Sequence, residues 1–295
     1  MPEKMPEIEI PSKETKIRCP QCQIQKIIEI PGYIFSQKSS GIIKIQFRAG
    51  QICEHDFMAF VDQNGAVRGY DKIDFQLEFN AQTAAEYAAG QKLHLETLLE
   101  SVGDFAVMNI FHAYMFDYPI YVILRPTDNP RFADQLNDLL LGLFPPELNT
   151  KQIIQSLNHQ AYLRLDVKES EYLVLDISGI ILNSPWGEKK KFEYEHELLK
   201  KALEIVDPTI QALQVRNEIA YFQKKAEFLL SYLETVKHTD EDDLKNKMSR
   251  EFRTKVTDAL FDLYLLFIKR RLPEKETLLK KIHLHTVDQL KAALW

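Results

Sequence analysis

The residues with the clearest chemistry are three cysteines and one histidine in the first 55 positions. Cys19 and Cys22 form a C-x-x-C pair, and Cys53 and His55 form a C-x-H pair. The sequence holds no other cysteine. Three thiolates and one imidazole make the Cys3His donor set that structural zinc binds tetrahedrally. We therefore expect Cys19, Cys22, Cys53 and His55 to bind one structural Zn²⁺.

Other roles fit these cysteines less well. A thioredoxin-like C-x-x-C lies between a strand and a helix, whereas the residues after Cys22 alternate in polarity and predict a strand. An odd cysteine count and the polar start of the chain disfavour a secreted disulfide framework, and an iron–sulfur cluster held by four cysteines lacks one ligand. Two alternatives stay open: a buried cysteine pair beside an unrelated histidine, and a catalytic zinc that uses His55 and keeps one open position.

The elements around these ligands are predicted to be short strands. Asn64-Gly65 is a strong hairpin signal, and each ligand pair lies beside an expected β-turn. In so small a module, metal binding supplies folding free energy that the core alone lacks. We expect a flexible arm at 1–16 and a zinc-binding, ribbon-like β module at 17–80. A period-two pattern predicts its strands at 24–30, 42–47, 57–61 and 66–77.

The middle of the chain alternates between helical and strand patterns, which is typical of an α/β arrangement. We expect an α/β domain at 90–186, after an Ala-rich short helix or linker at 81–89. Expected in order are a helix at 93–116 broken near Gly103, a strand at 118–124, a helix from Asn129-Pro130 to Leu143, a strand at 152–157, and a hairpin of strands 161–167 and 171–178.

The last part, 187–295, is predicted to be helical, with no strand after Lys191. A stripe of apolar residues spaced three and four apart runs from Ile219 to Val236, and a second helix is expected from Asp242 to Arg271. A short helix at 286–294 would end the chain. We expect the two long helices to form an antiparallel hairpin, so that the fold class is α+β.

Charge and hydropathy limit the classes of function. Residues 81–188 carry 6 basic and 14 acidic side chains, which disfavours a phosphate backbone as the partner of this region. The most apolar stretch, 105–124, is interrupted by Asp117 and Pro119 and makes a poor membrane span. We expect a cytoplasmic protein without a transmembrane segment. A nucleic-acid binder led by the zinc ribbon stays an alternative.

Catalytic motifs are scarce in the sequence. It contains no Gly-rich phosphate loop and no Gly-x-Ser-x-Gly. His112, on a mostly apolar helix, is either a general base or a hydrogen-bonded core histidine. His283 and His285 could form a metal pair, but no nearby acid or cysteine supports one. Whether the chain is an enzyme stays open, with a site in the middle domain near His112 as the enzymatic alternative.

A polar and aromatic cluster follows the Asn64-Gly65 turn. It consists of Arg68, Tyr70, Asp71 and Lys72. One interpretation is a surface that recognises a protein partner. The other is a cross-strand ion pair above a small sheet.

Two parts of the sequence resemble known families. The run Ile52–Asp62, the turn Asn64-Gly65 and the run Val67–Asp74, together with Cys19-Pro-Gln-Cys22, resemble an N-terminal zinc module of uncharacterised archaeal proteins. That resemblance covers about a fifth of the chain and implies zinc binding but no activity.

The middle and the tail resemble the central module of DENN-type regulators of small GTPases. The similarity lies in the order of elements: a helix with Asn109–Met115, a strand at Ile120–Leu124, a helix ending at Leu143-Phe144-Pro145, and a strand ending at Leu173–Ile177. It implies a small GTPase as partner. From all these features we expect a non-enzymatic cytoplasmic adaptor or scaffold with a structural zinc and a protein partner.

Overall fold

The computed structural model of the chain divides into two compact units, which are described separately. The first unit comprises Met1–Ile110, Ile120–Leu136 and Ile154–Pro185, and the second comprises Phe111–Pro119, Asn137–Ile153 and Trp186–Trp295. The structure describes residues 12–30, 32–35, 42–47, 49–55, 57–72, 93–126, 128–149, 154–165, 171–186 and 190–283.

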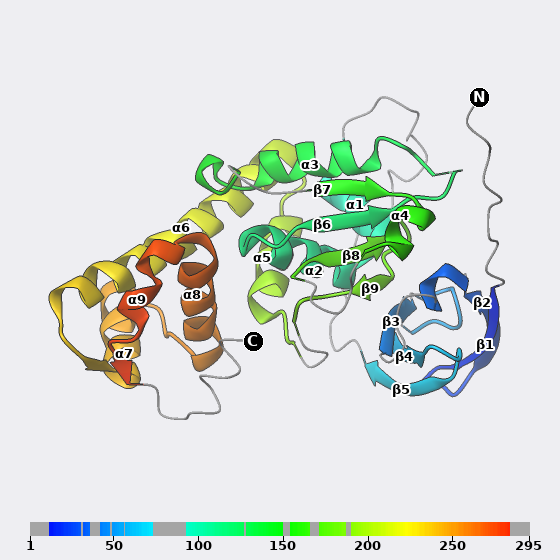
Figure 1. Cartoon of the computed structure of the whole chain (residues 1–295), viewed down its shortest axis with the longest axis horizontal. Helices are drawn as coiled ribbons and strands as arrows, with labels where there is room; N and C mark the ends of the chain where they lie inside the picture. The colour runs from blue at the N-terminus through cyan, green and yellow to red at the C-terminus, as the bar shows by residue number, and fades with distance from the viewer. Residues whose placement is uncertain are drawn as a thin grey trace. The chain divides into compact units, whose positions relative to one another are not determined.

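The first unit contains nine strands and short helices (Figure 1) within its described residues. Its N-terminal elements are β1 (Lys13–Arg18), β2 (Gln25–Ile30), η1 (Gly32–Phe35), β3 (Ile42–Phe47), β4 (Phe57–Asp62) and β5 (Val67–Lys72). The elements that follow are α1 (Leu95–Val102), β6 (Ile120–Ile123), β7 (Ile154–Leu157), α4 (His159–Leu163), β8 (Leu173–Asp176) and β9 (Ile181–Asn183). Helices α2 (Asp104–Met115) and α3 (Phe132–Leu143) begin in this unit and end in the second.

Seven strands form one mixed sheet, in the order β5-β4-β3-β9-β8-β6-β7. The β3, β4 and β5 strands make an antiparallel meander, with Phe47 of β3 opposite Phe57 of β4. The Asn64-Gly65 turn joins β4 to β5, as predicted. The β6 strand pairs in parallel with both β7 and β8. All four β8 residues are buried, which is typical of a parallel strand covered on both faces. The meander joins the parallel part through one residue pair, Lys44 and Ile181.

The β1 and β2 strands form a separate antiparallel hairpin, with Arg18 opposite Gln25 beside the connecting turn. Ile17 and Ile30 are buried and belong to the same apolar core as Phe47 and Phe57 on the meander. Ile123 and Val174 of the parallel strands also belong to it, so one core serves the metal-binding hairpins and the sheet.

Two expectations for the middle of the chain are wrong. Residues 161–163, expected to begin a strand at 161–167, lie in helix α4, because the Asn158 side chain accepts a hydrogen bond from the Ala161 N–H (2.8 Å) and caps a helix start. No hairpin joins 161–167 to 171–178 among the described residues, since β8 pairs with β6 and with the unexpected strand β9. The expected break at Gly103 is confirmed, with a φ of 87° that favours glycine.

The second unit is mainly helical in its described part. Its long helix α6 starts where the Asp207 carboxylate accepts hydrogen bonds from the N–H groups of Thr209 and Ile210 at 2.8 and 3.0 Å. Its elements are η2 (Pro146–Leu148), α5 (Glu193–Leu203), α6 (Pro208–Thr235), β10 (Thr239–Asp240), α7 (Glu241–Phe252), α8 (Asp258–Arg271), η3 (Pro273–Lys275), α9 (Glu276–Leu279) and β11 (Ile282–His283).

The predicted helical C-terminal part is confirmed, but its second long helix is wrong in detail. Residues 242–271 form two helices, because Arg253 adopts the left-handed conformation (φ 51°) at the end of α7. Thr257 then caps α8 by accepting a hydrogen bond from the Leu260 N–H. Two-residue strands β10 and β11 pair in parallel, so the expectation of no strand after Lys191 is also wrong.

Two consecutive arginines at the end of α8 bind the C-terminal carbonyls of α2. Arg271 donates hydrogen bonds to the carbonyl oxygens of Met115 (3.1 Å) and Leu148 (3.0 Å) and to that of Tyr114. Arg270 donates to the carbonyl oxygens of Phe116 and Asp117 at 3.3 and 3.1 Å. The carbonyls at a helix C-terminus lack i+4 donors, and the guanidinium groups supply donors to those at and just after the end of α2 and to Leu148 of η2.

In the described part of the chain, no helix is both long and apolar enough to cross a membrane. The expected helices at 81–89 and 286–294 and the expected strand residues 73–77 lie outside the described residues, and so does His285.

Candidate metal centre

The four predicted ligands come from two turns of the N-terminal hairpins. Cys19 and Cys22 lie in the turn between β1 and β2, and Cys53 and His55 lie in the turn between β3 and β4. Their donor atoms all lie within 4.8 Å of one another. The structure therefore brings together the full predicted ligand set.

The first turn has the geometry of a metal-binding knuckle. The Cys19 N–H donates to the Ile24 carbonyl (2.8 Å), and the Gln23 N–H donates to the Cys19 carbonyl (3.1 Å). The Gln21 N–H points at the Cys19 sulfur, 3.4 Å away. Gln23 has a φ of 65°, a conformation that costs a residue with a side chain about 1 kcal/mol or more. The turn thus holds one strained residue directly after Cys22.

The second turn is closed by Gly50, whose N–H donates to the Cys53 carbonyl at 2.6 Å. Gly50 has a φ of 89°, which only glycine adopts without strain. Cys53 Sγ lies 3.7 Å from His55 Nδ1. Two ligands bound tetrahedrally to one zinc, at about 2.3 Å for sulfur and about 2.0 Å for nitrogen, lie about 3.6 Å apart. This pair is therefore already at the separation that zinc requires.

The donor set fits a closed structural zinc. Cys19 is fully buried, and Cys22, Cys53 and His55 are partly buried. Two sulfurs on a tetrahedral zinc lie about 3.8 Å apart, so even the longest separation in the cluster has to contract by no more than about 1 Å. Four protein donors fill the tetrahedron, which favours a structural ion over a catalytic one with an open position.

The thiols of Cys19 and Cys53 differ in acidity. Burial opposes ionisation of Cys19, but hydrogen bonds from the backbone at Cys22 and Gln21 outweigh it and hold the pKa of the Cys19 thiol below its usual value. Burial raises the pKa of the Cys53 thiol to about 11, a shift that the backbone at His55 partly offsets. A cation at the centre would favour the thiolate at both positions.

An open groove lies next to the centre, and sequence reasoning missed it. It has a volume of about 360 Å³, and it lies beside β2, β3 and the second metal-binding turn. The Lys26 ammonium bridges the groove's two sides by donating to the Gln51 carbonyl at 2.8 Å. The lining residues are Lys26, Ile28, Glu29, Ile30, Ile45, Phe47, Gly50, Gln51, Ile52, Ser178 and Ile180.

The polar cluster after the Asn64-Gly65 turn makes local contacts. Arg68 Nε donates to Asp62 Oδ2 at 2.6 Å, and backbone hydrogen bonds led by Ala66, together with Arg68, lower the pKa of Asp62. The Tyr70 hydroxyl accepts a hydrogen bond from the Arg18 N–H at 2.8 Å. Asp71 is exposed. These contacts match the ion-pair interpretation, and the role of Arg68, Tyr70, Asp71 and Lys72 in partner binding stays a prediction.

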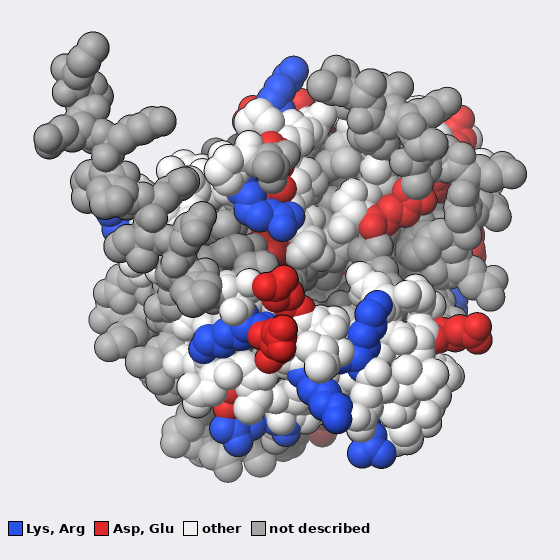
Figure 2. Space-filling model, turned by 90° about the vertical axis from the view of Figure 1, so that its right-hand side faces the viewer, with Lys and Arg blue, Asp and Glu red and all other residues white. Residues whose placement is uncertain are grey.

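Figure 2 shows basic and acidic side chains interspersed on the described part of one face of the chain. Exposed Lys16 and Arg18 on β1 lie near exposed Glu14 on the same strand. A phosphate backbone requires a continuous basic surface. The described residues on this face do not form one.

His112 is buried in the second unit, away from solvent. Its Nδ1 lies 2.6 Å from Glu195 Oε1, and each side chain is only 1% exposed. The rings of Phe116 and Trp186 lie 4.5 and 4.7 Å from the imidazole. This is the environment of a hydrogen-bonded core histidine, and a catalytic role for it stays a prediction. No local signal identifies Glu195, which lies 83 residues further along the chain.

The second predicted histidine position is at the surface. His283 ends β11 and is exposed, and its ring lies 5.3 Å from that of His238. The described residues place no carboxylate or thiol with these two rings in a metal-binding group.

Comparison with known proteins gives no relative. No protein-family model, no curated protein and no solved structure matches the chain. The resemblances to the archaeal zinc module and to DENN-type regulators therefore stay predictions, and the Cys3His cluster is the feature of the first resemblance that the structure shows.

Proposed function

We propose that this protein is a non-enzymatic, zinc-stabilised adaptor that binds an extended segment of a protein partner in the groove beside β2. The observation that carries the proposal is the combination, at one place, of a groove, a metal-binding turn and a β2 edge that no other described strand pairs with.

Both apolar and polar residues line the groove. Ile28 and Ile30 of β2 face Ile45 and Phe47 of β3 across it. Their side chains alternate along the strands, since residues two apart share one face. A bound strand would place every second side chain in the groove. Of these four residues, Ile30, Ile45 and Phe47 are buried in the core, so a bound apolar side chain would mainly cover the partly exposed Ile28.

The β2 strand offers main-chain hydrogen bonds to such a segment. Among the described residues β2 pairs only with β1, so its other edge has no strand beside it. Main-chain hydrogen bonds supply affinity when a peptide adds to a sheet edge, and side-chain pockets supply specificity. The β2 edge offers the main-chain hydrogen bonds, and the groove beside it offers space for side chains.

The zinc would hold the groove in shape. Gly50, Gln51 and Ile52, from the turn that carries Cys53 and His55, line one side of it. The other side is β2, which starts three residues after Cys22. An ion bound to both turns fixes these two sides relative to each other, so partner binding should require the metal.

The test is selection of peptides from a displayed random library on the zinc-loaded chain. Enriched peptides should carry apolar residues at alternate positions, and Ile28→Lys should weaken their binding by about 10-fold to 100-fold. Ile27→Lys is the matched control, because Ile27 is 62% exposed and points to the opposite face of the same strand. Failure to enrich any peptide, or equal binding by the Ile28→Lys variant, would refute the proposal.

A small GTPase is the first protein partner to test, because the order of elements in the middle of the chain resembles that of DENN-type regulators. The measurement is binding of nucleotide-free and GTP-loaded small GTPases to the zinc-loaded chain. Binding that Ile28→Lys abolishes would connect this partner to the groove. Binding that survives Ile28→Lys would place the GTPase elsewhere on the chain.

A further inference from the structure

Two histidines of the second unit come together from distant parts of the sequence. His238 immediately precedes β10, and His283 ends β11. Their imidazole rings lie 5.3 Å apart, centre to centre, with an angle of 30° between their planes. Both side chains are exposed, so each ring can turn without disturbing the core.

The separation of the two rings is close to the one that a shared metal ion requires. In a tetrahedral zinc site the Zn–N bonds are about 2.0 Å long, which puts each ring centre about 3.1 Å from the ion and two ring centres about 5 Å apart. Imidazole is also a preferred ligand of Zn²⁺, Cu²⁺ and Ni²⁺. Rotation of the two exposed side chains would therefore allow both rings to bind one such ion without movement of the backbone.

The backbone that carries the two histidines is held by hydrogen bonds. The Thr239 N–H donates to the Lys281 carbonyl at 3.0 Å. The Lys281 ammonium donates to the carbonyls of Leu233 and Val236 at 2.6 and 2.9 Å. Lys281 thus connects the end of α6 to the start of β11, and the pairing of β10 with β11 fixes the two short strands side by side. Because this frame is already ordered, an ion would order little beyond the two side chains.

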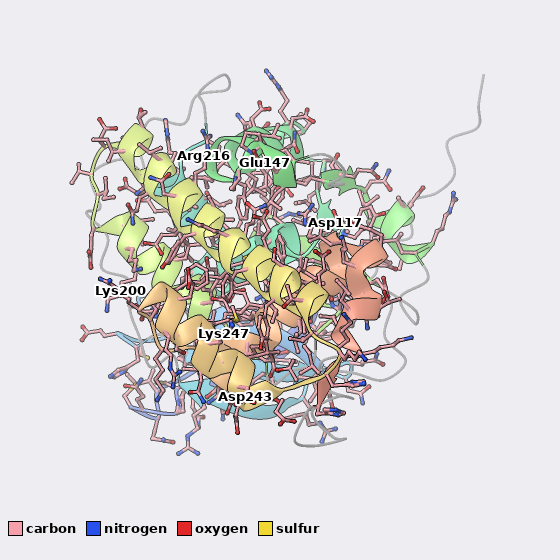
Figure 3. All side chains as sticks on the ribbon, turned by 90° about the vertical axis from the view of Figure 1, so that its left-hand side faces the viewer. Asp117, Glu147, Lys200, Arg216, Asp243 and Lys247 are labelled. Carbon is pink, nitrogen blue, oxygen red and sulfur yellow. The ribbon has the colours of Figure 1, made fainter. Side chains whose placement is uncertain are left out.

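Asp240 offers a third ligand on the same face of these strands. It lies opposite His283 in the parallel pairing and two residues after His238, and residues in these relations share a face. It is the N-cap residue of α7, but its exposed side chain makes no capping hydrogen bond. Its carboxylate would have to rotate toward the rings to reach the ion. Figure 3 shows α7, which starts directly after Asp240, with Asp243 and Lys247 labelled on it.

We propose that His238 and His283, with Asp240 as the third ligand, bind one divalent transition-metal ion of the class that prefers imidazole. Zn²⁺ represents this class. The site is separate from the Cys3His centre, and it should fill after that centre because it is exposed and offers no thiolate. An ion bound to both strands would cross-link the residues that connect α6 to α7 with the end of β11.

Isothermal titration calorimetry tests the proposal by adding Zn²⁺ to the full chain, with its Cys3His centre already loaded. We expect one further ion to bind. The variants His238→Asn, His283→Asn and Asp240→Ala should each weaken its binding at least about 10-fold, because even loss of an outer-shell partner costs a metal site about 10-fold to 100-fold in affinity. The control is His94→Asn, at an exposed histidine before α1, which should leave the affinity unchanged. Absence of a further ion, or unchanged affinity in any of the three ligand variants, would overturn the proposed ligand set.

A double variant distinguishes one shared ion from two independent surface histidines. If the ion needs both imidazoles, His238→Asn combined with His283→Asn should bind little more weakly than either single variant, because each change alone already breaks the site. Losses of binding free energy that simply add would overturn the shared site.

Amide hydrogen exchange gives a readout of the cross-link itself. Added Zn²⁺ should increase protection at 239–240 and 282–283 in the wild-type chain and leave the His238→Asn chain unchanged. Equal protection in both chains would overturn the cross-link, and circular dichroism checks that the variants are folded.

Discussion

The buried contact between His112 and Glu195 should contribute to stability through one hydrogen bond between neutral imidazole and carboxylate. Burial lowers the pKa of His112, and the opposing effect of Glu195 does not reverse this. The imidazole is therefore neutral at pH 7, and its Nδ1–H donates to Glu195 Oε1 at 2.6 Å. The other oxygen, Oε2, is buried without a hydrogen-bond partner. The carboxylate thus depends on this imidazole for a donor.

Removing the donor should be costly. In His112→Leu the buried carboxylate loses its partner, and we expect a loss of about 3–5 kcal/mol in the free energy of unfolding. In Glu195→Gln the amide oxygen still accepts from Nδ1–H and the charge is gone, so the loss should be only about 0.5–1.5 kcal/mol. The double variant with leucine at both positions should recover part of the first loss, because the buried carboxylate is removed together with its donor, and only part because Lys190 loses the nearby negative charge.

The same contact predicts how stability depends on pH. The unfolded His112 takes up a proton near pH 6.5, whereas the folded state resists protonation because the pKa of His112 is lowered. The unfolded chain therefore binds more protons below pH 6.5, and stability falls as the pH drops, by at most about 1.4 kcal/mol per pH unit from this residue. His112→Leu removes this part of the pH dependence.

Urea unfolding of wild type and the three variants at pH 7.5, 6.5 and 5.5 measures both effects. Subtracting the His112→Leu curve isolates the contribution of His112 from that of other groups, such as His159, whose pKa burial also lowers. Two results would refute the reasoning: a His112→Leu chain within about 1 kcal/mol of wild type at pH 7.5, or a difference between wild type and His112→Leu that grows as the pH falls from 6.5 to 5.5.

Three further predictions concern the metal and the backbone. Native mass spectrometry should find one zinc per chain, and Cys53→Ser should weaken zinc binding at least about 100-fold in a competition with a colorimetric chelator. Gln23→Gly should raise the free energy of unfolding by about 1 kcal/mol, because glycine adopts the φ of 65° without strain. The hydrogen bond from the Gln23 side chain to the Pro20 carbonyl is exposed, so its loss should matter little. A lower free energy of unfolding, measured with urea, would contradict this. Arg271→Lys should lower the free energy of unfolding by about 2–4 kcal/mol, since an ammonium cannot reach the carbonyls of Met115 and Leu148 together as the guanidinium does. An unchanged thermal midpoint would show that the end of α2 does not depend on the paired hydrogen bonds of the guanidinium.

The ligand set was predictable because its signals are local. Each pair, Cys19 with Cys22 and Cys53 with His55, lies within one turn, and residue type with spacing indicates zinc. The strands around them alternate in polarity, and Asn64-Gly65 marks the turn between two of them. The predicted strand at 42–47 agrees residue for residue with β3.

The predicted helices and strands were wrong where a single polar residue fixes a backbone conformation that the apolar pattern does not indicate. Asn158 caps α4 and turns an expected strand into a helix. The apolar stripe of 244–267 continues across Arg253, yet that residue turns left-handed and ends α7. Thr257 restarts the chain as α8. Apolar periodicity reports which face is buried, and it carries no information on where the hydrogen-bonding ladder is interrupted.

The contacts that organise each unit join residues far apart in the chain, and no spacing rule reaches them. Arg271 binds the end of a helix 156 residues earlier, and Lys44 joins the metal-binding meander to a strand 137 residues later.

The pairing of Lys44 with Ile181 also predicts how the protein responds to loss of the metal. The β3 strand belongs to the same sheet as the parallel strands and shares their core. The zinc-free protein should therefore keep the parallel strands and lose order first at the β1–β2 hairpin. Among the described residues, Cys19, Ile17 and Ile30 attach this hairpin to the core. Amide hydrogen exchange with and without chelator would then show zinc-dependent protection at β2 and the two turns, and little change at β6 and β8.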